Sequence, residues 1–271
     1  TSPLLQAWYV RVYPNHSPYR LYALSNIGSC FALLSYPFLF EPFFRLSQQT
    51  RDWSLGFGLF ILTCGSLSVL VHRAAILKTI SATPAFQDRD ALLADQLSPG
   101  WRWFFWLTLP SITSILLLAI TNQLCQDIAS VPFLWIVPLG FYLISFILCF
   151  AERRWYQRRF VVPLAVITTS SILLNLYVGN HFSLIGQIAL YNLGLFFCCM
   201  ICHGELFRLR PQPIGLTTYY LAIAAGGVFG SLFVALICPL IFSQYFELHI
   251  GLWACFALLL SLLRIESTLQ T

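Results

Sequence analysis

The residues best suited to chemistry in this sequence are Cys199, Cys202 and His203, which form a C-x-x-C-H motif. This spacing is that of c-type haem attachment. Here the motif ends a long apolar stretch just before Arg208 and Arg210, a setting with no room for a porphyrin. Haem is attached on the outer side of a membrane, whereas flanking arginines indicate the inner side. We therefore expect a packed helix end, with His203 in an interfacial cap or hydrogen-bonded cluster, rather than a haem site.

The remaining cysteines supply no second cluster. The chain has nine cysteines, an odd number, and most of them stand within apolar stretches, where a free Cys behaves as a small hydrophobic residue. These residues are Cys30, Cys64, Cys149, Cys198, Cys238 and Cys255. The pattern therefore predicts no metal site and no disulfide framework.

Strongly polar side chains well inside the apolar stretches are limited to Asn26, Asn175 and Asn192. Such amides either hydrogen-bond across helices or orient a substrate, and we favour the first role. The nearby acidic residues all fall at the ends of the stretches; they are Glu41, Asp127, Glu205 and Glu247. Proton relays and ion-coupled transporters generally need ionisable groups at membrane depth, and the sequence predicts none. It also contains no catalytic triad, carboxylate pair or phosphate-binding loop, so we expect no enzyme activity and no cofactor.

The elements that carry these residues follow from composition. Of 271 residues, 58% are hydrophobic and 9% are charged, against about 25% charged residues in soluble proteins. Crossing a bilayer takes roughly 20 apolar residues per helix. The uncharged stretches of that length are 21–40, 53–72, 103–121, 132–150, 161–178, 183–203, 217–242 and 248–263. The sequence therefore predicts a single all-α domain over 1–271, a polytopic transmembrane bundle of eight spans.

Lysine and arginine are distributed unequally between the two sides of this predicted bundle. One side carries thirteen of the fifteen: Arg11, Arg20, Arg73, Lys78, Arg89, Arg102, Arg153, Arg154, Arg158, Arg159, Arg208, Arg210 and Arg264. The other side carries only Arg45 and Arg51. The positive-inside rule then places both termini and the loop 73–102 in the cytoplasm. The net charge is +5, and we expect its excess basic residues to contact anionic lipid headgroups. We expect no nucleic-acid partner.

Small residues recur at helical spacing in two of the spans. Gly226 and Gly230 form a G-x-x-x-G pattern, and Ser25 and Ser29 lie similarly in the first span. Such faces allow helix backbones to approach closely in lipid. We favour packing within one bundle over dimerisation. Four prolines, Pro37, Pro110, Pro138 and Pro239, are candidate kinks.

Five stretches of the sequence are distinctive. They are TSPLLQAW at 1–8, PYRLYALSNIGSCFALLSYPFLFEP at 18–42, TNQLCQDIASVPFLWIVPLGFYLISFILCF at 121–150, CHGELFRLRP at 202–211 and LTTYYLAIAAGGVFGSLF at 216–233. Together they resemble the membrane domain of bacterial proteins in which a major-facilitator-like bundle is fused to a spermidine-synthase-like domain.

This resemblance implies about four further helices before the TSPLLQ stretch, and hence a bundle of twelve helices in the bacterial inner membrane. The loop 73–102 would join its two halves. The soluble aminopropyltransferase-like domain of that family has no counterpart in the sequence, so its activity carries over to no residue here.

Two functions remain for such a chain. The first is a non-catalytic scaffold or subunit that packs against other membrane proteins in a larger assembly, favoured by the lack of intramembrane charge and by the small-residue faces. The alternative is a transporter of a small organic solute such as a polyamine, favoured by the twelve-helix resemblance and the proline-containing spans.

Overall fold

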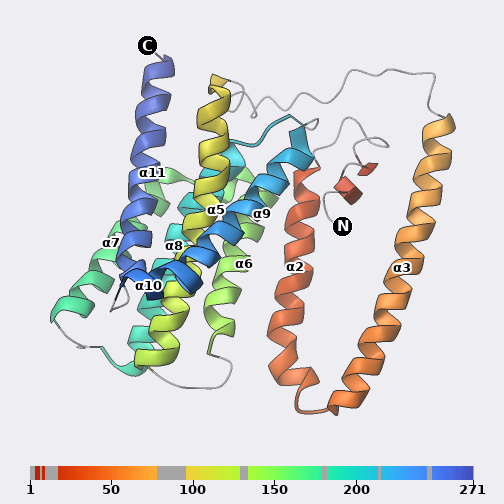
Figure 1. The fold of residues 1–271 in the computed structure, drawn as a ribbon, viewed down its shortest axis with the longest axis horizontal. Helices are drawn as coiled ribbons and strands as arrows, with labels where there is room; N and C mark the ends of the chain where they lie inside the picture. The colour runs from red at the N-terminus through yellow and green to blue at the C-terminus, as the bar shows by residue number, and fades with distance from the viewer. Residues whose placement is uncertain are drawn as a thin grey trace.

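The computed structural model describes residues 4–6, 8–9, 18–77, 96–128, 134–178, 182–212, 215–242 and 246–270, and its regular structure there is entirely helical (Figure 1). The first helices are α2 (Tyr19–Ser35), which continues as the π-helical turn η1 (Tyr36–Phe40), and α3 (Leu46–Leu77). Then come α5 (Pro99–Asn122) with η3 (Gln123–Ile128), α6 (Ile136–Ala151), the 3-10 turn η4 (Arg153–Trp155), α7 (Arg158–Val178) and α8 (Leu184–Arg208). The last are α9 (Leu216–Leu232) with η6 (Phe233–Ile237), α10 (Cys238–Ile241) and α11 (Glu247–Gln270).

Seven helical segments in these ranges are long and apolar enough to cross a membrane. The prediction of an all-α bundle of membrane helices is therefore confirmed. The helix in the fourth predicted span, α6, has only 16 residues and spans about 24 Å, less than a hydrocarbon core of about 30 Å. The chain is a multi-pass membrane protein by the length and composition of its helices.

Helices α5 and α8 lie at the centre of the bundle. Helix α5 packs against α8, α9 and α11, while α8 also packs against α6 and α7. The buried share of the apolar window is 61% for α5 and 50% for α8, higher than in any other of the seven segments. These two helices therefore carry most of the side chains that are shielded from the surroundings.

The hairpin of α2 and α3 is attached to this group from one side. Helix α2 packs against α6, whereas α3 stands apart from the other helices in Figure 1. No residue in the apolar window of α3 is buried, and only 11% of the window of α2 is. The hairpin thus presents two long apolar helices, of which the described residues cover one face of α2 and bury no residue in the apolar window of α3.

Helix α9 lies against α5 through two of its glycines. A Cβ atom added at Gly226 would collide with the Leu107 carbonyl oxygen, and one at Gly230 with the Ser111 carbonyl oxygen. The Ser111 hydroxyl donates a hydrogen bond to the Gly226 carbonyl oxygen at 2.8 Å. The close approach of these two backbones therefore requires glycine at 226 and 230.

Carbonyl groups at the end of α8 are satisfied by side chains of neighbouring helices. The Tyr219 hydroxyl donates to the Leu206 oxygen at 2.8 Å, and the Trp106 indole Nε1 donates to the Leu209 oxygen, also at 2.8 Å. Carbonyls in the last turn of a helix lack the regular i,i+4 backbone partner and are costly to leave unpaired away from water. These bonds fix the end of α8 against α5 and α9.

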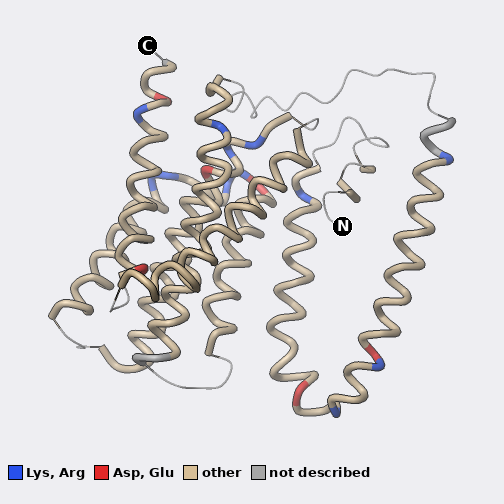
Figure 2. The backbone as a smooth tube through the Cα atoms, viewed as in Figure 1, with Lys and Arg blue, Asp and Glu red and all other residues tan. Residues whose placement is uncertain are grey.

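Most described lysine and arginine residues gather toward one end of the bundle (Figure 2). This distribution agrees with the unequal charge counts found in the sequence. Arg45 and Arg51, the two basic residues assigned to the other side, lie in the α2–α3 turn and in the first turns of α3. The loop 73–102 lies outside the described residues from 78 to 95.

Candidate functional site

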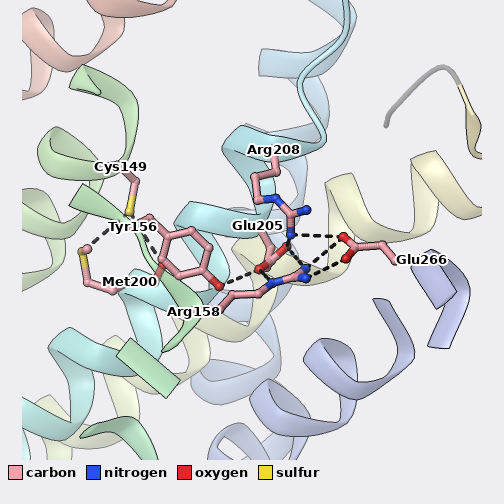
Figure 3. A network of polar contacts seen from close by, with 7 residues as sticks. All are labelled: Cys149, Tyr156, Arg158, Met200, Glu205, Arg208 and Glu266. Atoms are coloured by element: carbon pink, nitrogen blue, oxygen red, sulfur yellow. Dashed lines mark hydrogen bonds and ion pairs between the residues drawn. The ribbon is translucent and has the colours of Figure 1, made fainter. Parts of the chain in front are cut away.

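A cluster of charged side chains lies where the start of α7 meets the ends of α8 and α11 (Figure 3). Glu205 of α8 is at its centre, with a fully buried side chain. The Arg158 guanidinium donates to both Glu205 oxygens, from Nε to Oε1 and from Nη2 to Oε2, each at 2.6 Å. This bidentate arrangement is the strongest form of arginine–carboxylate pairing.

A second arginine and a second carboxylate complete the cluster. Arg208, three residues after Glu205, donates from Nη1 to Glu205 Oε2 at 2.9 Å. Glu266 of α11 accepts from Arg158 at 2.6 and 2.9 Å and pairs with Arg208 at 3.1 Å. Two guanidinium groups thus lie between a buried carboxylate and a partly exposed one, and the four charges sum to zero.

Tyr156 reaches the cluster from the connection between α6 and α7. Its hydroxyl donates to Glu205 Oε1 at 2.5 Å. The turn η4 directs Tyr156 onto α8, and Gly204 leaves room for it, since a Cβ there would collide with the Tyr156 ring. Burial, followed by the negative charge of Glu205, raises the pKa of the Tyr156 phenol above its usual value of 10.0. The phenol therefore stays a hydrogen-bond donor at physiological pH.

The four charged residues Arg158, Glu205, Arg208 and Glu266, called the clamp below, join helices through ion pairs. Both of its arginines are bound to carboxylates, and the Tyr156 hydroxyl is hydrogen-bonded to Glu205. Among the described residues, no group of three or more His, Cys, Asp or Glu side chains is placed to hold a metal ion. What the cluster does is tie three helices together through charge-assisted hydrogen bonds.

A second polar contact lies deeper in the bundle, between α6 and α8. His203 is fully buried, and its Nδ1 lies 2.9 Å from the Ser145 hydroxyl oxygen. That hydroxyl also lies 2.7 Å from the Tyr142 carbonyl oxygen, to which it can donate. The His203 Nε2 atom has no hydrogen-bond partner among the described residues, and the ring lies against Phe146 with centroids 3.6 Å apart.

The C-x-x-C-H motif lies wholly inside α8. Cys199, Cys202 and His203 are each fully buried, and the Cys202 sulfur contacts the Cys255 sulfur of α11 at 3.7 Å. All nine cysteines are free thiols. The motif therefore packs against neighbouring helices, and His203 lies within the helix and not at an interfacial cap.

The other residues singled out from the sequence are not brought together. Asn26 and Asn192 donate to carbonyl oxygens one turn earlier in their own helices, at 2.9 and 2.8 Å, rather than across helices. Asn175 is buried in α7. Ser25 and Ser29 lie on an exposed face of α2, and no described helix packs on them.

With this geometry established, the chain can be compared with known proteins. No protein-family model, curated protein or solved structure matches it.

Glu205 lies in the last turn of α8, at the end of its span as expected, but its burial was not predicted. The predicted span stopped at residue 203 because Glu205 and Arg208 are charged, but α8 continues to Arg208, and Glu205 is buried within it. A signal was present: the i,i+3 spacing of Glu205 and Arg208, with Arg158 and Glu266 at helix ends on the same predicted side. Opposite charges at helix ends on the same predicted side can form ion pairs, and this pattern indicates the cluster.

Proposed function

We propose that the chain is a non-catalytic membrane scaffold, a subunit that binds other membrane proteins through its α2–α3 hairpin. The observation that carries this proposal is that no residue in the apolar window of α3 is buried. Nothing within 4 Å would contact a Cβ added at Gly56, Gly58 or Gly65, so the backbone of α3 is open to a close helical partner.

Site-specific photo-crosslinking tests this function. A photoreactive amino acid at Leu62 of α3, which is 71% exposed, should form a discrete protein adduct in the native membrane. The matched control is Ile167 of α7, which is 61% exposed and lies outside the α2–α3 hairpin. Adducts at Leu62 but not at Ile167 support a scaffold. Lipid-only products at both sites, together with a monomeric native mass, would exclude it.

We further infer that the helices are the last eight of a twelve-helix, major-facilitator-like bundle in a bacterial inner membrane. The support is the way in which the helices before and after the loop 73–102 form two separate groups. The helices after it pack around α5 and α8, whereas the two before it form a separate hairpin that reaches the group through α2 and α6. A half-bundle followed by a joining loop is expected to give this pattern. The further helices of that half would pack on part of the hairpin, and the scaffold proposal concerns the apolar face of α3 that they leave open.

A small-solute transporter is the second candidate, and the buried contact around His203 favours it. The Nε2 atom is a buried polar group without a partner among the described residues, and a polar solute could bind to it there. Polyamine uptake into proteoliposomes, lost in His203→Leu, would support transport. A polycation would still need a negative partner, and Glu205 is already neutralised by two arginines.

A further inference from the structure

The two carboxylates of the charged cluster are held very differently. Glu205 lies beneath Arg158 and Arg208 with a fully buried side chain, while Glu266 caps them from the outside at 13% exposure. The side chains of both arginines are 24% exposed. The guanidinium groups therefore have one permanent inner partner and one outer partner near the surface.

Glu205 orients both guanidinium groups toward the outer position. It occupies Arg158 Nε and Nη2 and accepts from Arg208 Nη1. The Arg158 Nη1 and Nη2 atoms and the Arg208 Nη1 atom also reach Glu266, at 2.6, 2.9 and 3.1 Å. Three contacts from two planar cations converge on one pair of oxygen atoms, which is the geometry by which arginines bind carboxylates and phosphates.

The outer carboxylate belongs to the least buried part of its helix. Residues 267–269, which follow Glu266 in α11, are all exposed. Figure 1 shows this end of α11 extending past the neighbouring helices. Glu266 can therefore leave the arginines without disturbing the core. The remaining three charges, two positive and one negative, would sum to +1 and attract an anion.

We propose that Arg158 and Arg208 form an oxyanion-binding site in which Glu266 is a built-in, displaceable ligand. The ligand class is a phosphate group, presented either by a lipid headgroup or as a free anion. The site lies on the predicted cytoplasmic side, at the depth where headgroup phosphates meet helix ends. This inference does not depend on the scaffold function, because it rests only on the geometry of the cluster.

Removing the internal ligand tests the proposal. The full chain carrying Glu266→Ala should bind inorganic phosphate at least tenfold more tightly than the wild type in nanodiscs of phosphatidylcholine, measured by calorimetry. Two variants serve as controls. Glu266→Ala combined with Arg158→Gln lacks the cradle and should bind no better than wild type. Glu152→Ala removes an exposed carboxylate that pairs with Arg154 outside the cluster, and should leave phosphate binding unchanged.

The source of the phosphate is separated by lipid composition. If anionic phosphatidylglycerol in the nanodisc abolishes binding of free phosphate to Glu266→Ala, a headgroup occupies the site. If binding is equal in both lipids, the site selects a free anion. A folded, monodisperse Glu266→Ala that binds phosphate no more tightly than the double variant would overturn the proposal. Should that variant fail to fold, Glu266→Gln with the same Arg158→Gln control gives the same comparison.

Discussion

Glu205 and Glu266 share the same two arginines, yet their burial predicts unequal contributions to stability. Glu205→Gln would leave the partly buried Arg158 and Arg208 without their inner counter-charge and with Glu266 alone as a negative partner. Breaking a buried pair by removing one partner costs about 3–5 kcal/mol. We expect a clear fall in the thermal unfolding midpoint of the purified protein, and a smaller fall for Glu266→Gln, because Glu266 is partly solvated.

Glu152→Gln is the matched control, since its ion pair with Arg154 is largely exposed and such pairs contribute about 0–1 kcal/mol. Equal unfolding midpoints for Glu205→Gln and Glu152→Gln would show that the clamp does not stabilise the bundle.

Tyr156 gives a prediction with a defined pH range. Tyr156→Phe removes a hydrogen bond to a charged group, worth about 1.5–3 kcal/mol. Burial and the charge of Glu205 raise the phenol pKa above 10.0, its value when unfolded. The contribution is therefore fully present below pH about 10 and is lost as the pH rises through the folded pKa. The difference in unfolding midpoint between wild type and variant should be constant from about pH 7 to 9. A difference that disappears within this range would contradict the assignment.

At the scale of helices, the contact between α9 and α5 depends on two glycines. Gly226→Ala and Gly230→Ala would each push a methyl group into a backbone carbonyl of α5, which cannot move as a side chain can. Overpacking of this kind costs about 1–3 kcal/mol. Gly227→Ala is the control on the same helix, because its Cβ would lie 3.5 Å from the Ser114 hydroxyl, an ordinary contact. We expect Gly226→Ala and Gly230→Ala to lower the unfolding midpoint and Gly227→Ala to unfold near the wild-type midpoint. A loss of the same size at all three positions would indicate a helix-wide effect.

The positions of these helices could be predicted from the sequence, whereas their ends and their ion pairs could not. Apolar length located every described long helix, because membrane helices must satisfy their own backbone and are uniformly apolar. Helix ends were less predictable. A charged residue such as Glu205 predicts the end of an apolar span, although pairing with Arg158 allows it to be buried in the last turn of the helix. Pairing between residues 47 positions apart is a property of the packed bundle, and single-sequence periodicity does not contain it.

The small-residue faces show the same limit. Both G-x-x-x-G at Gly226 and the serines at Ser25 and Ser29 suit close packing, but only the first meets a described neighbour. Local spacing defines which face can pack, whereas the partner depends on how the other helices are arranged.

At the scale of the whole molecule, the number of membrane crossings depends on α6, whose 16 residues are short for a span. The Trp106 indole near the start of α5 bonds to Leu209 at the end of α8, so these two points lie at one end of the bundle. Tyr19, at the start of α2, likewise bonds to the Pro211 carbonyl. Four helices, α5 to α8, connect the first pair of points. We therefore predict an even number of crossings between these points, in which α6 also crosses and local thinning of the bilayer or flanking residues compensate for its length.

Reporter fusions distinguish the two crossing counts. With eight crossings, a reporter fused after residue 151 and one fused after residue 270 should both lie on the same side as the N-terminus. The side should be the cytoplasm, because thirteen of the fifteen basic residues flank these ends. A reporter in the α2–α3 turn, beside Arg45, should lie on the opposite side. If α6 does not cross, the fusions after 151 and 270 will both appear opposite to the N-terminus. The clamp of Arg158, Glu205 and Glu266 would then lie on the outer surface, away from the cytoplasmic headgroups.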